Sequence, residues 1–148
     1  MVTVDELRRL IERGEDIHLE FKQSREKITR DVYDTVCSFS NRDGGHILLG
    51  VRDDGKIVGI EPSRVEHIQK EFVTAINNKE KIFPPLYLQP ERIVIDGKVV
   101  LHIFVPVGNQ ACVIRINIRR CIREGYLSSS RVICSGQLFH WTKFQLGL

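Results

Sequence analysis

The chain has 148 residues, of which 42% are hydrophobic and 28% charged, a composition typical of one globular domain with its own core. No apolar run approaches the roughly 20 residues that span a bilayer, which excludes a membrane-spanning protein by this criterion. The formal net charge is +3. The last 39 residues carry six basic residues and one acid, and the first 109 carry 16 basic and 18 acidic residues, so overall charge alone does not indicate nucleic-acid binding.

The N-terminus lacks the basic-then-apolar pattern of a signal peptide, so the sequence predicts a cytoplasmic protein. The four cysteines include no CxxC pair, which argues against a structural zinc site. We therefore expect free thiols in a reducing compartment. The five histidines have no metal-ligand spacing and are expected to be surface or hydrogen-bonded residues.

The first half of the chain predicts a helix, a strand and a second helix. Thr3 and Glu6 form a capping box for a helix over residues 4–13. Residues 17–22 alternate apolar and polar side chains, with Ile17, Leu19 and Phe21 on one face, as in a half-buried strand. A second helix follows Thr29 as its cap and runs to about Ser40, and Cys37 is expected at its buried face.

The second half predicts two hairpins around a third helix. Residues 47–51 and 57–60 are expected to pair across the turn 53–55, because Asp54-Gly55 suits a tight turn. Ser63 and Glu66 form a second capping box for a helix that ends near residue 77. Residues 92–95 and 99–105 form the second hairpin. This order predicts an α+β fold with a mixed, mainly antiparallel sheet and about three helices.

The composition changes abruptly at Gln110. We therefore predict a domain over residues 1–109 and a basic tail over residues 110–148. Residues 113–118 could form a strand, and neither a helical nor a strand period persists after them. The tail is either a basic interaction arm or non-native sequence, and we expect it to be poorly ordered beyond about Arg120.

Two groups of residues are candidates for chemistry. Glu15 and Glu20 flank the first strand and Asp53 follows the next, so these carboxylates could hold a divalent cation such as Mg²⁺ or Mn²⁺. The alternative is that they are a surface acid and turn residues. The basic residues around the start of the second helix suit phosphate contacts, or else form an ordinary solvated face.

Glycine spacing excludes two nucleotide-binding motifs. Gly44-Gly45 follows a helix and precedes a strand, which is the wrong order for a P-loop or a dinucleotide fingerprint. The chain contains no GxxxxGK[ST], so no ATPase motif is present. Paired glycines before an apolar strand instead indicate that the backbone passes close to another segment.

An ordered set of short motifs resembles the Schlafen AlbA_2 domain family. The matching residues run from Gly14 to Pro106 and comprise Glu20-Phe21-Lys22, Ser24, Phe39-Ser40-Asn41, Gly44-Gly45, Leu49-Gly50-Val51, Asp53-Asp54-Gly55 and Gly59. The resemblance implies an α+β domain that binds DNA, found in bacterial transcriptional regulators and helicase-related proteins. In the Schlafen branch, it implies a metal-dependent endoribonuclease site, here Glu15, Glu20 and Asp53 or Asp54.

Three functions follow as hypotheses. The preferred one is nucleic-acid binding, DNA or RNA, with phosphate contacts from Lys22, Arg25, Lys27, Arg30, Arg42 and Arg52. The second is a metal-dependent ribonuclease with Glu15, Glu20 and Asp53 as catalytic and metal-binding residues. The third is a non-catalytic interaction domain, in which an exposed sheet edge forms a homodimer.

Overall fold

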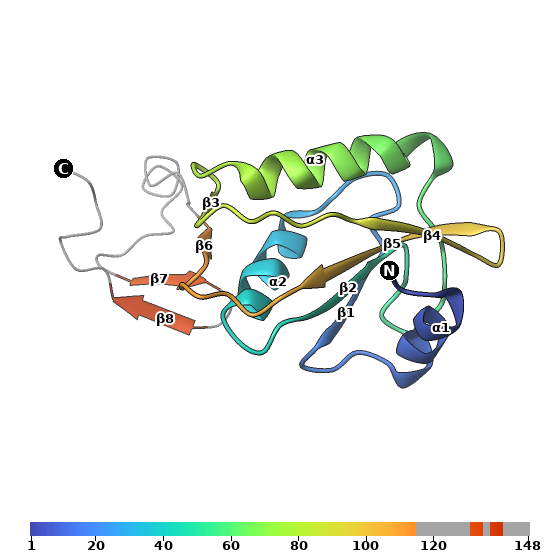
Figure 1. Cartoon of the computed structure of the whole chain (residues 1–148), viewed down its shortest axis with the longest axis horizontal. Coiled ribbons are helices and arrows are strands. Elements are labelled where there is room, and N and C mark those ends of the chain that lie inside the picture. The colour runs from blue at the N-terminus through green and yellow to red at the C-terminus, as the bar shows by residue number, and fades with distance from the viewer. Residues whose placement is uncertain (115–130, 135–136, 141–148) are drawn as a thin grey trace.

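A computed structural model describes residues 1–114, 131–134 and 137–140 (Figure 1). The elements in chain order are α1 (Val4–Arg13), β1 (Leu19–Lys22), α2 (Arg30–Ser40), β2 (Gly45–Leu49), a 3₁₀ turn (Pro62–Arg64), α3 (Val65–Asn77), β3 (Ile82–Phe83), β4 (Glu91–Ile95), β5 (Lys98–Val105), β6 (Val113–Ile114), β7 (Arg131–Cys134) and β8 (Gln137–His140).

The main sheet has the strand order β1-β2-β5-β4. β1 and β2 are parallel and are joined through α2, whereas β2–β5 and β5–β4 are antiparallel. The β4–β5 hairpin forms as predicted, with Asp96 and Gly97 both at positive φ in its turn. The described residues form three α-helices and a mixed, mainly antiparallel four-stranded sheet, which confirms the α+β prediction.

The sheet separates two hydrophobic cores, which lie on its opposite faces. α2 and α3 cover one face, where Val36 and Phe72 pack against Leu101 and Ile103 of β5. α1 covers part of the other face, where Leu7 packs with Phe21, Leu48 and Val100. Figure 1 shows α3 above the sheet and α1 below it. Burial against the sheet, rather than helix propensity, therefore fixes these helices.

The three helices have the predicted extents, but their N-terminal caps differ. At α1 both hydrogen bonds of the capping box form, from Glu6 N to Thr3 Oγ1 and from Thr3 N to Glu6 Oε2. At α2, Thr29 is the N-cap without a side-chain cap bond. The predicted box at Ser63 does not form, because the 3₁₀ turn moves the N-cap of α3 to Arg64.

Two strand predictions were wrong in detail. Ile17 is 68% exposed and lies outside β1, because the bridge between Asp16 and Leu19 turns the chain there. The first predicted hairpin reduces to the single bridge Val51–Ile57. β2 pairs with β1 and β5 instead, and Ile60 bridges to Val99. The turn at Asp54-Gly55 thus predicted that β2 pairs with the next segment of the chain, whereas β2 is a central strand that pairs with β1 and β5.

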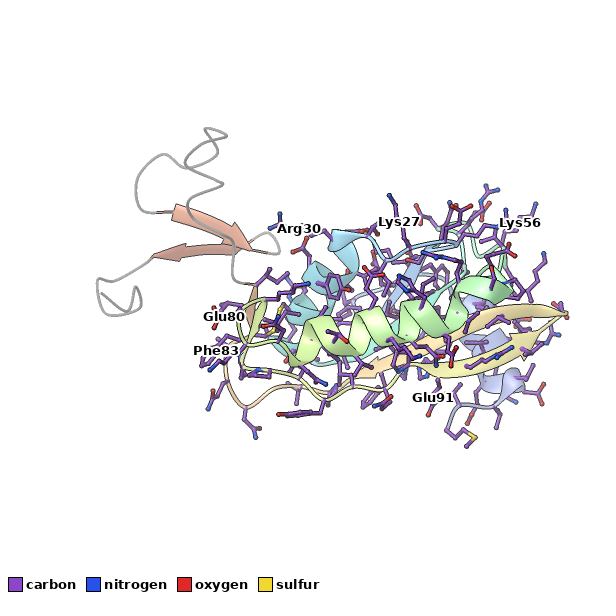
Figure 2. All side chains as sticks on the ribbon, turned by 90° about the horizontal axis from the view of Figure 1, so that it is seen from above. Lys27, Arg30, Lys56, Glu80, Phe83 and Glu91 are labelled. Carbon is purple, nitrogen blue, oxygen red and sulfur yellow. A yellow bond between two sulfur atoms is a disulfide. The ribbon has the colours of Figure 1, made fainter. Side chains whose placement is uncertain are left out.

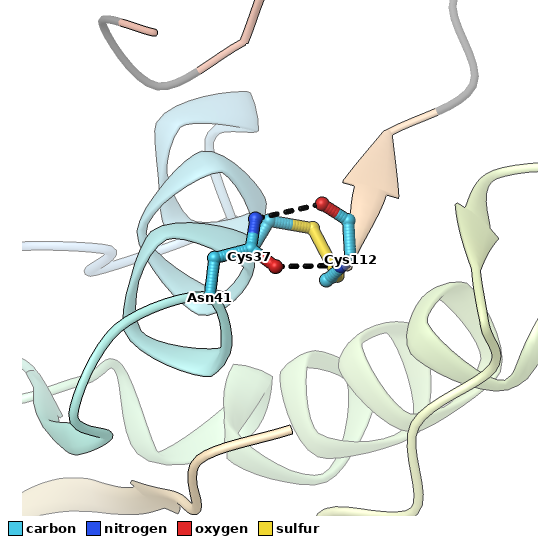
Figure 3. The surroundings of a disulfide bond; sticks show 3 residues. All are labelled: Cys37, Asn41 and Cys112. Carbon is cyan, nitrogen blue, oxygen red and sulfur yellow. Dashed lines mark hydrogen bonds between the residues drawn. A yellow bond between two sulfur atoms is a disulfide. The ribbon is translucent and has the colours of Figure 1, made fainter. Parts of the chain in front are cut away.

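The expectation of free thiols was wrong for two of the four cysteines. Cys37 of α2 and Cys112, just before β6, form a disulfide (Figure 3). Cys37 does lie at the buried face of its helix, as predicted, with 2% of its surface exposed. Sequence spacing gave no sign of the pairing, because 75 positions separate the two residues.

Only short pieces of the region after residue 109 are described. β6 pairs with β3, and β7 pairs with β8 in an antiparallel hairpin, in a stretch where no strand period was recognised. The remaining tail residues, 115–130, 135–136 and 141–148, lie outside the described residues, so the predicted tail disorder and domain boundary stay predictions. Within the described residues, no helix has the length and hydropathy needed to cross a membrane.

Candidate functional site

The parallel pairing of β1 and β2 brings the carboxyl ends of both strands to one edge of the sheet. The carbonyl of Lys22 accepts hydrogen bonds from Gly50 N at 2.7 Å and from Val51 N at 3.3 Å. The segment that carries Arg52 and Asp53 therefore starts directly beside the end of β1. This is the place where the sequence predicted the acidic and basic groups to converge.

Lys22 lies between two carboxylates. Its Nζ atom is 2.7 Å from Oε1 of Glu20 and 2.9 Å from Oδ2 of Asp31. Burial lowers the pKa of Lys22, but the hydrogen bonds to these carboxylates outweigh burial and leave the pKa raised. Burial likewise raises the pKa of Asp31, and hydrogen bonds from Thr29 and Lys22 reverse that effect and lower it. Lys22 thus joins β1 to the start of α2 rather than standing free for a ligand.

Glu15 has a local partner at the outer edge of the sheet. Its Oε1 atom accepts a hydrogen bond of 2.9 Å from the backbone N–H of Phe21. The carboxylate therefore satisfies a donor on the open side of β1, beside the bridge from Asp16 to Leu19. This contact gives Glu15 a structural role in the fold.

Asp53 and Asp54 lie in the predicted tight turn. Gly55 N donates to Arg52 O at 2.8 Å, and Asp54 accepts from Lys56 N at 3.0 Å. Asp54 also pairs with Arg52, at 2.8 Å between Oδ2 and Nη2. Asp53 is exposed in this turn. The side chains of Arg52 and Asp54, and not that of Asp53, thus make the contacts that stabilise the turn.

These carboxylates do not make a metal site in this arrangement. Among the described residues, no three His, Cys, Asp or Glu side chains are grouped so that they could hold a metal ion. One oxygen of Glu15 already accepts from Phe21 N, and one oxygen of Glu20 already pairs with Lys22 Nζ. The metal-binding and catalytic role of Glu15, Glu20 and Asp53 stays a prediction.

The predicted basic residues divide into paired and unpaired groups. Arg25, Lys27 and Arg30 are exposed on the segment from the end of β1 to the start of α2 and make no ion pair with the described residues. Figure 2 shows Lys27 and Arg30 pointing outward on the same side of the molecule. Arg42 is exposed in the turn after α2, whereas Arg52 is held by Asp54.

A shallow hollow beside Lys27 adds a basic residue that sequence reasoning missed. It measures about 320 Å³ and is lined by Glu26, Lys27, Glu61, Ser63 and Arg64. Arg64 Nε donates to the carbonyl of Glu26 at 3.1 Å, and Glu61 N donates to Arg25 O at 2.9 Å. These bonds join the basic segment to the start of α3. A residue 34 positions beyond Arg30 carried no local sequence signal for this contact.

The glycine pair has a packing explanation. A Cβ atom on Gly44 would lie 2.7 Å from the carbonyl oxygen of Val105, and one on Gly45 would lie 2.7 Å from the ring of Phe39. Gly44 also has a φ of +76°, which side-chain-bearing residues rarely adopt. The close backbone approach predicted for this pair is confirmed, and its partners are protein segments.

A buried polar chain on the α1 side of the sheet was also missed. His102 is 2% exposed, its Nδ1 lies 3.4 Å from Oε2 of Glu91, and its Nε2 lies 2.9 Å from Nδ1 of His46. If Nδ1–H of a neutral His102 donates to Glu91, then Nε2 of His102 is the acceptor and the hydrogen between the two rings belongs to Nδ1 of His46. Each residue alone resembled an ordinary strand residue, so only the strand register reveals the group.

Comparison with known proteins assigns the chain to a family. Residues 15–128 match the Schlafen AlbA_2 family, and the chain belongs to it. The match extends past residue 109, where the sequence composition changes. An uncharacterised ATP-binding protein of Ureaplasma parvum is 42% identical over 67 residues, which are 43% of this chain and 19% of that protein. The similarity therefore covers about a fifth of that relative's length.

Two solved structures share the fold. The N-terminal domain of a RecG-related helicase-like protein from Nitrosomonas europaea has a TM-score of 0.57 at 18% identity, covering 79% of this chain and 83% of that one. The DIP2311 protein of Corynebacterium diphtheriae has a TM-score of 0.50 at 16% identity, covering 74% and 26%. At these identities the likeness concerns the fold alone.

Proposed function

We propose that this chain is a nucleic-acid-binding domain that contacts phosphates through the segment between β1 and α2. The observation that carries the proposal is the exposure of Arg25, Lys27 and Arg30 on one short segment, without ion-pair partners among the described residues. Unpaired cations attract a polyanion without first breaking an internal pair. Arg64 extends this surface, and Glu26 and Glu61 dilute it.

The setting of the domain supports the same proposal. The chain belongs to the Schlafen AlbA_2 family, and one structure of the same fold comes from a RecG-related helicase-like protein. We propose that the domain serves a larger cytoplasmic protein, such as a transcriptional regulator, by holding it on DNA or RNA. Lys22 is assigned a supporting role, because Glu20 and Asp31 neutralise it.

The test is a salt titration of binding to labelled duplex DNA and to RNA by fluorescence anisotropy. We compare a triple alanine variant of Arg25, Lys27 and Arg30 with a control in which Lys70, Lys79 and Lys81 become alanine, so both variants lose three charges. The first variant should bind about tenfold more weakly, with a log–log salt slope for DNA smaller by about 2 to 3. Equal weakening by the control would show that only net charge matters and would refute the proposed surface.

A metal-dependent ribonuclease is the second candidate. It is favoured by one observation, the meeting of the carboxyl ends of β1 and β2, which places Glu20 and Asp53 on adjoining segments. RNA cleavage that requires Mn²⁺ and disappears in Glu20→Gln would support it, and cleavage that persists in this variant would refute it. A homodimer without catalysis is the third alternative, which light scattering over a concentration series tests.

A further inference from the structure

One covalent link connects two parts of the fold that the main sheet does not hold together. The disulfide joins Cys37, in the last turn of α2, to Cys112, which lies between β5 and β6. Their Cα atoms are 5.2 Å apart, and the two residues are 2% and 1% exposed. The pair is therefore enclosed within the core formed with α2 and α3.

The same contact has a noncovalent half (Figure 3). Asn41 lies one helical turn after Cys37, and its Nδ2 atom donates to Cys112 O at 2.8 Å. Its Oδ1 atom accepts from Cys112 N at 2.6 Å. Asn41 thus satisfies both backbone groups of Cys112 and holds this residue beside the end of α2. After reduction these two hydrogen bonds would guide the released segment back to α2, so that the disulfide can re-form.

The segment held by this contact lies outside the four-stranded sheet. Gly108 N donates to Ser40 O at 2.8 Å, and β6 forms only a two-residue ladder with β3, Val113 with Phe83 and Ile114 with Ile82. Within residues 108–114, Gln110 and Ala111 are exposed. Release of residues 108–114 would therefore leave the pairing of β1, β2, β5 and β4 intact.

We propose that Cys37 and Cys112 form a reversible redox modification site that fixes residues 108–114 to α2 when oxidised. Oxidation needs a disulfide of the glutathione class: the two thiols and one RSSR molecule give one protein disulfide and two RSH molecules. Reduction is the reverse exchange: a dithiol becomes a disulfide, and the two cysteines regain two protons and two electrons. This proposal is independent of the proposed nucleic-acid binding.

The test uses the full chain in buffers of defined ratios of reduced to oxidised glutathione. Free thiols are alkylated, and peptide mapping then gives the fraction of each cysteine that a disulfide protected from alkylation. Cys121 and Cys134 are the controls. Cys37 and Cys112 should become protected together and reversibly, and Cys121→Ser should leave their protection unchanged. Failure to form the bond, pairing with Cys121 or Cys134, or a bond that resists both glutathione and dithiol would each overturn the proposal.

Hydrogen exchange in the oxidised and reduced protein tests whether the disulfide controls the docking of residues 108–114 on α2. Reduction should speed amide exchange in residues 108–114 by at least about tenfold, with little change in β2 and β5. Cys112→Ala should reproduce the reduced profile in oxidising buffer. Wild-type protein in reducing buffer supplies the same comparison if the variant does not fold. Equal exchange of residues 108–114 in both redox states would refute the proposed control of docking.

Discussion

The Nδ1 atom of His46 lies 2.9 Å from the Nε2 atom of His102, within the sheet face that α1 covers only in part. Phe104 also packs against His46, with 5.3 Å between ring centroids. Only one hydrogen can occupy the line between the two nitrogens, so the contact requires at least one acceptor nitrogen. The pair is therefore compatible with neutral rings and is broken when both are protonated.

The histidine pair predicts a loss of stability in mild acid. Burial lowers the pKa of His46, assisted by His102, and burial lowers the pKa of His102 although Glu91 opposes it. In mild acid the unfolded chain therefore binds more protons than the folded chain. The contribution of the pair to the free energy of unfolding is fully present above the ordinary histidine pKa of about 6.5, and it decreases as the pH drops below that value. The slope is at most about 1.4 kcal/mol per pH unit for each proton.

Urea unfolding between pH 7.5 and 5.5 measures this effect. His46→Gln should flatten the pH dependence, because glutamine does not titrate and the His102 contact is altered. His67→Gln is the control, since His67 is exposed on α3 and has only a 3.9 Å pairing with Glu71. A wild-type slope in His46→Gln would contradict the prediction.

The two predicted capping boxes give a matched test of helix capping. Thr3→Ala removes the acceptor for Glu6 N at the start of α1 and should reduce the free energy of unfolding by about 1 kcal/mol. Ser63→Ala should change it by less than about 0.5 kcal/mol, because Ser63 makes no cap bond. Chemical denaturation measures both. Equal losses would mean that Ser63 caps α3 in solution.

The glycine before β2 gives a test of steric fit. Gly44→Ala combines a positive φ with a Cβ that would lie 2.7 Å from Val105 O, whereas Gly97→Ala has a φ of +73° and no atom within 4 Å. Gly97→Ala should cost about 1 kcal/mol, and Gly44→Ala should cost more, because backbone must also shift. Thermal and urea unfolding compare them. Similar decreases in the free energy of unfolding would show that the backbone at Val105 shifts at little cost.

Lys22 provides a test of support against direct contact. Lys22→Met should reduce stability by about 1 kcal/mol, because Glu20 and Asp31 lose a shared cation. The pKa of Asp31 should rise when the hydrogen bond from Lys22 is lost. Carboxyl titration by NMR checks this shift. The salt slope of nucleic-acid binding should stay unchanged, and a decrease would make Lys22 a phosphate contact.

The sequence was most informative where the determinants are local. Helical periodicity and the Thr3 cap predicted α1, and Asp96-Gly97 predicted the β4–β5 hairpin. Prediction failed where distant segments compete for the same strand: β2 prefers β1 and β5 to residues 57–60. The candidate site shows the same division. Exposure of Lys27 and Arg30 was expected, but the carboxylates that hold Lys22, the approach of Arg64 and the Cys37–Cys112 bond depend on tertiary contacts.

Neither face of β5 is exposed to solvent from Val99 to Ile103, because its apolar side chains alternate between the two cores and His102 is buried among them. Shifting it by one residue would exchange Val100 and Leu101 between two aliphatic environments that accept either, so hydrophobicity opposes such a slip only weakly. The shift would, however, remove His102 from Glu91 and His46. The register of β5 is therefore determined by the length of the Asp96-Gly97 turn and by this buried polar chain, and not by hydrophobicity.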